Sequence, residues 1–334
     1  MSAPLRVGVI GLGVGERHVV SYKSIDDVEV ASVCDLDPVR LVEVADRHAV
    51  AGRHSDYRRV TEDPDLDVVS ICSYDDDHVD HAISALRHGK HVMVEKPVAL
   101  DPDAAERLLA AQRESGCLLT SNLILRASPR FIELRADLAA GRYGDPYYVE
   151  ADYLHQILWK LTDGWRGRMD TYSVIYGGGI HLIDLVRWLL GREVTEVCGM
   201  ANKILTRDTA YRFHDSTVNI LRFEGDVLCK TFTTLGPQRT KLHRLDLYGT
   251  AGTFLNGIPT ATRFTGDQPE DEEAVSTLYP GMDKGDLLPE FVDAIRSGGD
   301  PAVTVEDVFR VMEVCFAAER SIVEGRTVAV DRIF

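Results

Sequence analysis

The sequence has no pair of cysteines with the spacing of a metal site or a redox motif. Six cysteines are scattered through 334 residues, and no two of them form a Cys-x-x-Cys pair. Most of them lie in apolar stretches, so we interpret them as buried small hydrophobic residues rather than zinc ligands or disulfide partners. His78 and His81 stand at a predicted helix start with no third ligand evident, and we predict no metal site.

Long apolar stretches are also missing. No run approaches the roughly 18 apolar residues that a membrane-spanning helix requires, so we expect no contact with a membrane. The first ten residues, MSAPLRVGVI, lead directly into a strand pattern without the basic and long apolar segments of a signal peptide. The expected location is therefore the cytoplasm.

Basic residues are scarce relative to acidic ones. Lys and Arg number 37 against 53 Asp and Glu, which gives a formal net charge of −16. The phosphates of a nucleic acid would be repelled by this surplus, so we expect no nucleic-acid partner. The charge also argues against a strongly anionic substrate, although a local basic pocket would override the average. The simplest interpretation is a solvated acidic surface that aids solubility.

The first 120 residues alternate strand and helix patterns. Near-continuous apolar strands separated by helices indicate an α/β fold with a parallel sheet covered on both faces. Asp37-Pro38 and Asp101-Pro102 each place an N-cap candidate before a proline at the first helical position. The expected strands span 5–10, 28–34, 67–72, 91–94 and 117–121, and the expected helices span 16–24, 37–48, 77–88 and 101–115.

After about residue 122 strands dominate, which indicates a second domain with a large, mainly antiparallel sheet. We place the domains at 1–122 and 123–334, a division that also suits the length of the chain. Thr304 and Asp307 form a candidate capping box for a helix over 304–322, which is a candidate to pack back on the first domain. Other expected elements are strands 146–155, 194–203, 217–224, 227–235 and 241–249 and helices 128–140 and 178–190.

A glycine-rich turn follows the first strand in the stretch GVIGLGVGERHV, residues 8–19. Such a turn allows the backbone to approach a pyrophosphate at a helix N-terminus, as in dinucleotide-binding folds. The literal G-x-G-x-x-G pattern fails because Glu16 stands three residues after Gly13. Gly11, Gly13 and Gly15 instead form a compressed G-x-G-x-G, with Leu12 and Val14 between them.

An acidic residue stands where a ribose ligand is expected. Asp35 ends the second strand, 24 residues after Gly11, close to the spacing typical of an acid that binds the adenosine ribose. A carboxylate there accepts hydrogen bonds from the ribose hydroxyls and repels a 2′-phosphate. Leu36 and Asp37 follow, with no arginine beside Asp35 to receive such a phosphate. These residues favour NAD over NADP.

The stretch SICSYDDDHVDHAISALRHGKHVMVEKPVAL, residues 70–100, resembles the signature of the Gfo/Idh/MocA oxidoreductases, the family of glucose–fructose oxidoreductase and inositol dehydrogenase. The resemblance extends over essentially the whole chain. It includes the stretches 122–129 and 179–184 and YGTAGTF at 248–254. It implies an N-terminal Rossmann domain followed by an α/β domain with a large open sheet. That sheet is often the oligomer interface, so we expect a homo-oligomer, a dimer or tetramer.

The resemblance also implies a set of cofactor contacts. The loop at 75–78 matches the place where the family contacts the nicotinamide ribose. The candidate cofactor-binding residues are therefore Gly11, Leu12, Gly13, Val14, Gly15, Asp35, Ser73, Tyr74, His78, Glu95 and Lys96.

Lys96 and His181 are the candidate catalytic residues. Lys96 ends the fourth main strand, and ligands of doubly wound sheets lie beyond the carboxyl ends of strands. Its ammonium could stabilise an alkoxide that forms as hydride leaves, and Pro97 would fix the local chain, in this family through a cis peptide. Histidine titrates near neutral pH, so His181 is the expected base for the hydroxyl proton.

The chain departs from the family pattern at one position. The family carries this base in Asp-x-Gly-x-His-x-x-Asp, and Gly177 stands in place of the leading aspartate. Lys96 and His181 suffice, or one of Asp170, Tyr172 and His155 compensates. Asp184, one turn after His181, either orients it or has a structural role. The candidate substrate-binding residues are Lys96, Asn122, His155, Trp165, Arg166, Tyr172, His181 and Asp184.

These observations predict an NAD-dependent dehydrogenase that oxidises a secondary ring hydroxyl of a sugar or aminosugar in a biosynthetic pathway. Relatives imply ring carbon 3 and a substrate that is free or linked to a nucleotide or glycoside. Inositol dehydrogenase is the alternative within the class. A non-catalytic NAD-binding regulator and a redox-assisted glycoside-cleaving enzyme are alternatives from other classes. Acids at 75–77 and 270–273 favour a neutral or cationic sugar over a sugar phosphate if either cluster borders the cleft.

Overall fold

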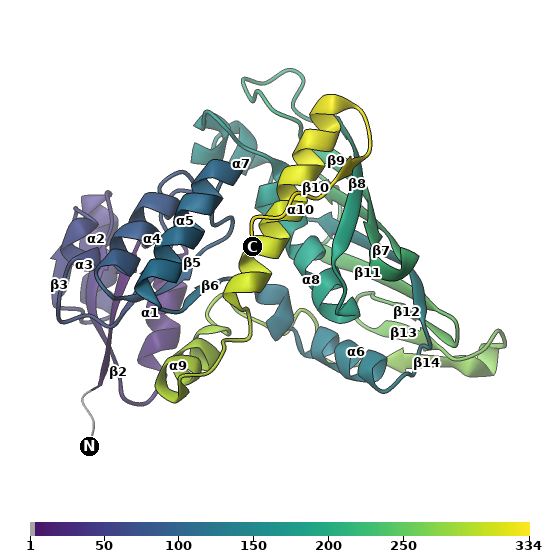
Figure 1. The fold of residues 1–334 in the computed structure, drawn as a ribbon, viewed down its shortest axis with the longest axis horizontal. Coiled ribbons are helices and arrows are strands. Elements are labelled where there is room, and N and C mark those ends of the chain that lie inside the picture. Colours follow the sequence, from purple (N-terminus) through teal and green to yellow (C-terminus); the bar gives the residue numbers. More distant parts are fainter. Residues whose placement is uncertain (1–3) are drawn as a thin grey trace. The chain divides into compact units, whose positions relative to one another are not determined.

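The computed structural model describes residues 4–334, which fall into two compact units (Figure 1). The first unit runs to Ile124 and also takes Asp283–Phe309 and Ile333–Phe334. The second unit comprises Leu125–Met282 and Arg310–Arg332. The chain therefore returns to the first unit after residue 282, and the long helix α10 contributes residues to both units.

The first unit has a parallel sheet in the order β3-β2-β1-β4-β5-β6. This order and the helices between successive strands confirm the predicted doubly wound Rossmann architecture. The elements are β1 (Leu5–Ile10), α1 (Gly15–Lys23), β2 (Val28–Cys34), α2 (Pro38–Arg47), β3 (Gly52–His54), α3 (Arg58–Thr61), β4 (Val68–Ile71), α4 (His78–Arg87), β5 (His91–Val94), α5 (Pro102–Ser115), β6 (Leu119–Ser121) and α9 (Leu288–Ser297).

The helix starts of this unit follow the capping signals. Asp37 accepts a hydrogen bond from the amide of Val39 at 3.0 Å, and Asp101 accepts one from the amide of Ala104 at 2.8 Å. Both predicted N-caps are thereby confirmed. The central strands β1, β4 and β5 are buried apolar runs, because helices cover both faces of the sheet.

The second unit has a mixed sheet in the order β14-β13-β12-β11-β7-β10-β9-β8-β15. Within the described residues β7 and β10 run parallel and the other neighbours are antiparallel, which confirms a mainly antiparallel sheet. The elements are η1 (Ile124–Ala127), α6 (Pro129–Ala139), β7 (Pro146–Leu154), α7 (Trp159–Thr162), η2 (Trp165–Arg168), η3 (Ile175–Gly179), α8 (Ile180–Leu190), β8 (Val194–Asn202), β9 (Ser216–Phe223), η4 (Glu224–Asp226), β10 (Leu228–Thr234), β11 (Leu242–Gly249), β12 (Gly252–Leu255), β13 (Ala261–Phe264), η5 (Pro269–Asp271), β14 (Glu272–Val275), α10 (Val305–Glu324) and β15 (Val328–Ala329).

One face of this sheet is covered by η3 and α8. A Cβ built on Gly178 would lie 2.6 Å from the Tyr153 ring, and one on Gly179 would lie 2.9 Å from the Thr233 hydroxyl. Glycines therefore allow η3 to lie directly on β7 and β10. The opposite face carries large apolar side chains that are exposed, at Met200, Val218 and Ile220 among others.

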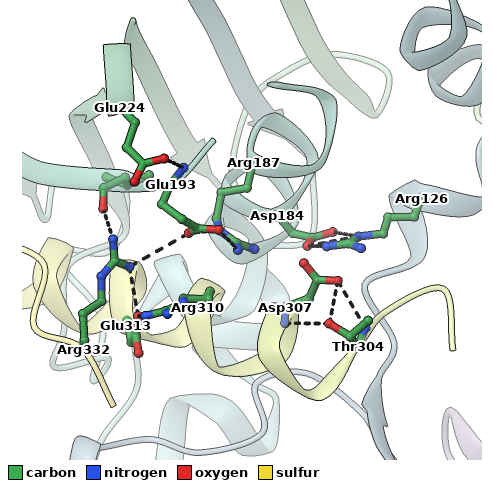
Figure 2. A network of polar contacts seen from close by, with 11 residues as sticks. Arg126, Asp184, Arg187, Glu193, Glu224, Thr304, Asp307, Arg310, Glu313 and Arg332 are labelled. Carbon is green, nitrogen blue, oxygen red and sulfur yellow. Dashed lines mark hydrogen bonds and ion pairs between the residues drawn. The ribbon is translucent and has the colours of Figure 1, made fainter. Parts of the chain in front are cut away.

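Two further features agree with the sequence. Thr304 and Asp307 form the predicted capping box at the start of α10, with each side chain bonded to the other residue's backbone amide (Figure 2). The six cysteines are all free, and four of them are buried. Among residues 4–334, no helix combines the length and the apolar character needed to cross a membrane.

Candidate active site

The glycine-rich turn between β1 and α1 uses its three glycines differently. Gly11 has a φ of +83°, and a Cβ there would lie 2.3 Å from the carbonyl oxygen of Cys72. The position of a Gly13 Cβ has no heavy atom within 4 Å, so a ligand can approach the backbone there. A Gly15 Cβ would lie 2.9 Å from Val9, so Gly15 permits close packing of α1 on the sheet. This turn fits a pyrophosphate at the start of α1.

Asp35 is buried at the end of β2, where it binds the turn itself. Its Oδ2 accepts a hydrogen bond from the amide of Leu12 at 2.7 Å, and its Oδ1 accepts one from Asp37 at 2.8 Å. Asp37, not Asp35, caps α2, as expected. The sequence has no arginine next to Asp35, but the fold brings one close to it. The first turn of α2 places Nη1 of Arg40 3.8 Å from Oδ2 of Asp35.

The loop after β4 is held by histidines. His78 is fully buried, and its Nδ1 lies 2.7 Å from the carbonyl oxygen of Pro97 while its Nε2 lies 3.3 Å from that of Ser73. The Ser73 hydroxyl lies 3.0 Å from Nδ1 of His81, whose pKa burial lowers to about 4. Tyr74 is exposed. His78 thus joins the loops that follow β4 and β5. Within residues 4–334, no cluster of three acidic, histidine or cysteine side chains could hold a metal ion.

Lys96 follows β5 between two anchored residues. The Lys96–Pro97 peptide is cis, as the family resemblance implied. Glu95 donates its amide to the carbonyl oxygen of Ile71 at 2.8 Å, and its carboxylate accepts a hydrogen bond from Asn122 at 2.8 Å. The Lys96 side chain itself is partly exposed. The predicted residues Glu95, Lys96 and Asn122 therefore lie together at the carboxyl ends of β5 and β6.

His181 lies in the first turn of α8, in an aromatic cluster of the second unit. Its ring stacks on Tyr153 of β7, with the centroids 6.1 Å apart and the planes 16° from parallel. The Tyr153 hydroxyl lies 3.2 Å from Nδ1 of His155, and its ring lies 5.4 Å from that of His243. Burial raises the pKa of Tyr153 to about 12, while the positive charge of Arg166 opposes the rise.

Tyr172 fills the space at Gly177. A Cβ on Gly177 would lie 2.0 Å from the Tyr172 hydroxyl oxygen, so no larger residue fits beside this tyrosine. Tyr172 is 4% exposed. Asp170, by contrast, is fully exposed and lies 3.3 Å from Arg212. Of the three residues considered as replacements for the family aspartate, Tyr172 has its hydroxyl directly beside Gly177.

Asp184 lies in a buried ion pair. Arg126 donates to it from Nε at 3.0 Å and from Nη2 at 2.6 Å, and the two side chains face each other in Figure 2. Their side chains are 4% and 1% exposed for Arg126 and Asp184 respectively. This buried bidentate ion pair fixes α8 against η1. The structural role for Asp184, left open by the sequence, is the one that this geometry supports.

Trp165 and Arg166 lie in η2, and both are partly exposed. The Arg166 guanidinium stacks on the Trp165 ring at 4.1 Å from its centroid. The cation thus lies over the indole face, within the range of a cation–π contact. Its effect on the pKa of Tyr153 indicates that this guanidinium lies near the His181 cluster.

Sequence reasoning missed one residue of the first unit. His18 is fully buried in α1, with Nδ1 2.7 Å from the Ser70 hydroxyl and Nε2 3.5 Å from the Glu95 carboxylate. The available signal was its spacing: His18 shares the buried face of α1 with Gly15, Val19 and Tyr22. A polar residue on an apolar helix face requires a buried partner.

Known proteins resemble this chain along its whole length. Residues 5–123 match a family model described as an oxidoreductase family with an NAD-binding Rossmann fold, and residues 131–255 match the GFO/IDH/MocA C-terminal domain. The chain is 26% identical to a myo-inositol 2-dehydrogenase of Thermotoga maritima, over 98% of this chain and 99% of that protein. It is 31% identical to a D-glucoside 3-dehydrogenase of Escherichia coli, over 57% of this chain and 55% of that protein. The fold is similar to that of a levoglucosan dehydrogenase solved with NADH, with a TM-score of 0.89, 20% identity and coverage of 98% and 100%.

Proposed function

Because the chain belongs to the Gfo/Idh/MocA family of NAD-dependent oxidoreductases acting on CH–OH groups, we propose that it oxidises a secondary ring hydroxyl of a sugar or aminosugar. Ring carbon 3 is the proposed position. One observation carries the proposal: Lys96 stands at the carboxyl end of β5, between Glu95 and Pro97, which buried side chains anchor on both sides. Such anchoring is typical of a side chain that must meet a reacting atom accurately.

Residues of the first unit would hold the cofactor. The backbone of Gly11–Gly15 would cradle the pyrophosphate, and Asp35 would accept hydrogen bonds from the adenosine ribose. Ser73 and Tyr74, in the loop after β4, are proposed contacts to the nicotinamide half. NAD supplies a hydride acceptor when it is bound.

The proposed chemistry of the chain divides between Lys96 and His181. The Lys96 ammonium would donate a hydrogen bond to the substrate hydroxyl and stabilise the negative charge that develops on its oxygen. His181 would accept the hydroxyl proton, since a neutral imidazole is a base near physiological pH. Stacking on Tyr153 restricts the His181 ring to one plane. Tyr172 and His155 are the second candidates for proton acceptor, and Trp165, Arg166 and Asn122 are proposed substrate contacts.

The nature of the sugar is also a proposal. The 26% identical relative supports an inositol as the alternative, and the 31% identical one supports a glucoside. Of the two acidic clusters, residues 270–273 lie at or beside β14, which β13, β12 and β11 separate from β7. Residues 75–77 follow β4, at the end of the sheet where ligands bind. They alone support the preference for a neutral or cationic sugar.

A substrate panel tests this function. Purified protein is incubated with NAD and each of a set of hexoses, glycosides, aminosugars, nucleotide sugars and inositols, and NADH formation is followed by its absorbance. We expect turnover with a sugar or glycoside, and within a matched set the amino or neutral sugar should exceed the phosphorylated one. The preference for a cationic sugar should weaken with salt, since the Debye length is about 10 Å at 0.1 M. Tight NADH binding without any turnover would favour the non-catalytic regulator instead.

Two variants test the assigned roles. Lys96→Ala and His181→Ala should each lower kcat by at least about 10²-fold, the lower end for a positioned acid or base, and leave NADH affinity within about threefold. Lys23→Ala and His88→Ala change the same residue types at exposed positions and should retain full activity. Near-normal turnover in His181→Ala would indicate that another residue, Tyr172 or His155, accepts the hydroxyl proton.

A further inference from the structure

A buried polar cluster in the first unit joins helix α1 to the residue before Lys96. His18 is 0% exposed and Glu95 is 8% exposed. Nε2 of His18 lies 3.5 Å from Oε1 of Glu95, and its Nδ1 lies 2.7 Å from the Ser70 hydroxyl on β4. Asn122, after β6, lies against both of them. The cluster therefore connects α1 with three neighbouring strands, and the proposed chemistry gives His18 no part.

Hydrogen counting at Asn122 leaves the Glu95 carboxylate as the acceptor beside Nε2 of His18. The amide nitrogen of Asn122 carries two hydrogens, and two oxygens lie within reach: Oε1 of Glu95 at 2.8 Å and the carbonyl oxygen of Lys284 at 2.8 Å. Both neighbours are acceptors, so the amide nitrogen must face them and both hydrogens are used. Nε2 of His18, 3.3 Å from the same nitrogen, receives neither hydrogen. A hydrogen on Nε2 would therefore have Oε1 of Glu95, 3.5 Å away, as its acceptor.

The carboxylate requires a positive partner at this depth. A buried carboxylate without a counter-charge is strongly disfavoured relative to its protonated form. Burial opposes the charge on His18, but Cys72 and Glu95 outweigh it and raise the pKa of His18 to about 10. Burial likewise opposes ionisation of Glu95, but His18, Lys284 and Asn122 hold its pKa below the usual range. The pKa values of the two residues are thus displaced in the directions that favour an imidazolium beside a carboxylate.

We propose that the buried His18–Glu95 ion pair positions Lys96 and links it to the helix whose first turn holds the cofactor pyrophosphate. His18 stands three residues after Gly15, in the turn of α1 that a pyrophosphate would contact. Glu95 immediately precedes Lys96, and Pro97 on the other side is fixed by His78. Both members of the pair act as positioning residues: the carboxylate of Glu95, a candidate cofactor contact in the sequence, binds Asn122 and lies 3.5 Å from His18. This inference rests on the proposed catalytic role of Lys96.

The ion pair is tested by three variants: His18→Gln, Glu95→Gln and the double variant. Each single change leaves one buried charge without its partner, whereas the double change restores neutrality and allows two amides to pair. We expect each single variant to lower kcat about 10- to 100-fold, the effect of a misplacement on the order of 1 Å, on whichever panel sugar is oxidised. NADH affinity should stay within about threefold. The double variant should recover at least tenfold of the loss. His91→Gln, at the amino end of the same strand β5, is the matched control.

A second measurement needs no substrate. Labelling of Lys96 by trinitrobenzenesulfonate, followed by mass spectrometry, reports the fraction of neutral amine. Glu95→Gln removes a negative charge beside Lys96 and should accelerate labelling, whereas His18→Gln removes a positive charge and should slow it. The double variant removes both charges and should return to the parent rate. Equal labelling in all four proteins, or single variants that lose thermal stability but keep kcat per folded molecule, would overturn the inference. If Lys96→Ala itself keeps full activity, the proposed function fails, and labelling still decides whether the pair acts on Lys96.

Discussion

Cofactor choice should depend on Asp35 and be moderated by Arg40. The perturbation is Asp35→Ala, compared with the parent protein for binding of NADH and NADPH by fluorescence titration. Asp35 is 7% exposed and accepts the amides of Leu12 and Asp37, so its carboxylate is fixed in position. Each oxygen keeps a lone pair for a ribose hydroxyl.

The magnitude follows from charge and distance. A 2′-phosphate in place of the ribose hydroxyl would bring a negative charge to about 4 Å from Asp35, which at an effective dielectric constant of about 20 costs about 4 kcal/mol. Arg40 lies 3.8 Å from the same carboxylate and is 46% exposed, so it offsets part of this repulsion through partly screened attraction. We therefore expect the parent to prefer NADH by about 10²-fold, below the roughly 10³-fold of the uncompensated repulsion.

Two variants separate the two charges. Asp35→Ala should reduce the preference to within about tenfold, and it should also weaken NADH binding, because hydrogen bonds to a charged group contribute about 1.5–3 kcal/mol each. Arg40→Ala should leave NADH affinity nearly unchanged and weaken NADPH binding by about twofold to fivefold, the scale of an exposed ion pair. Equal or tighter NADPH binding by the parent would refute the assignment of Asp35. An unchanged NADPH affinity in Arg40→Ala would contradict the role of Arg40.

Three further predictions concern the second unit. Gly177→Ala should lower the free energy of unfolding in urea by about 1–3 kcal/mol through overpacking against Tyr172. A second change, Tyr172→Phe, should restore much of this loss. A single variant as stable as the parent would contradict the close contact between Gly177 and Tyr172. Asp184→Asn should cost about 3–5 kcal/mol, because it breaks a buried ion pair from one side; a loss below about 1 kcal/mol in the same assay would contradict this prediction. If the exposed apolar face of the sheet is the proposed homo-oligomer interface, Ile220→Lys should shift the sedimentation mass to a smaller species, and an unchanged mass excludes that face.

The fold was predictable where burial produces an unambiguous pattern. The strands at 5–10, 28–34 and 91–94 have the predicted bounds, because central parallel strands are continuous apolar runs. The edge strand β3 was missed because its three residues, Gly52–His54, are too short and polar to form a pattern. Helix α9 was also missed, although a proline at its start and Gly298 after its end are ordinary helix signals.

Contacts between distant residues could not be read from patterns. The parallel pairing of β7 with β10 joins strands about eighty residues apart, and each strand alone looks the same in either orientation. Arg40 was overlooked because adjacency in sequence was used where one helical turn determines adjacency in space. His18 and Glu95 are 77 positions apart, and no pattern in the sequence indicates that the two side chains meet. Motifs identified the glycine-rich turn and Lys96, but not the buried residues that hold them in position.

The departure at Gly177 is explained by a contact with a residue five positions earlier, Tyr172. Read alone, the glycine suggests a site that has lost an acidic group. In the structure the Tyr172 hydroxyl lies where a side chain at position 177 would begin, so glycine and tyrosine are complementary. A phenol provides a hydrogen-bond donor and acceptor without a fixed negative charge. A polar group is therefore kept beside η3, but it is a neutral phenol instead of a charged carboxylate. An aspartate restored at position 177 would clash with Tyr172 unless the tyrosine moved. Gly177 and Tyr172 must therefore be tested together, because either substitution alone changes the space available to the other.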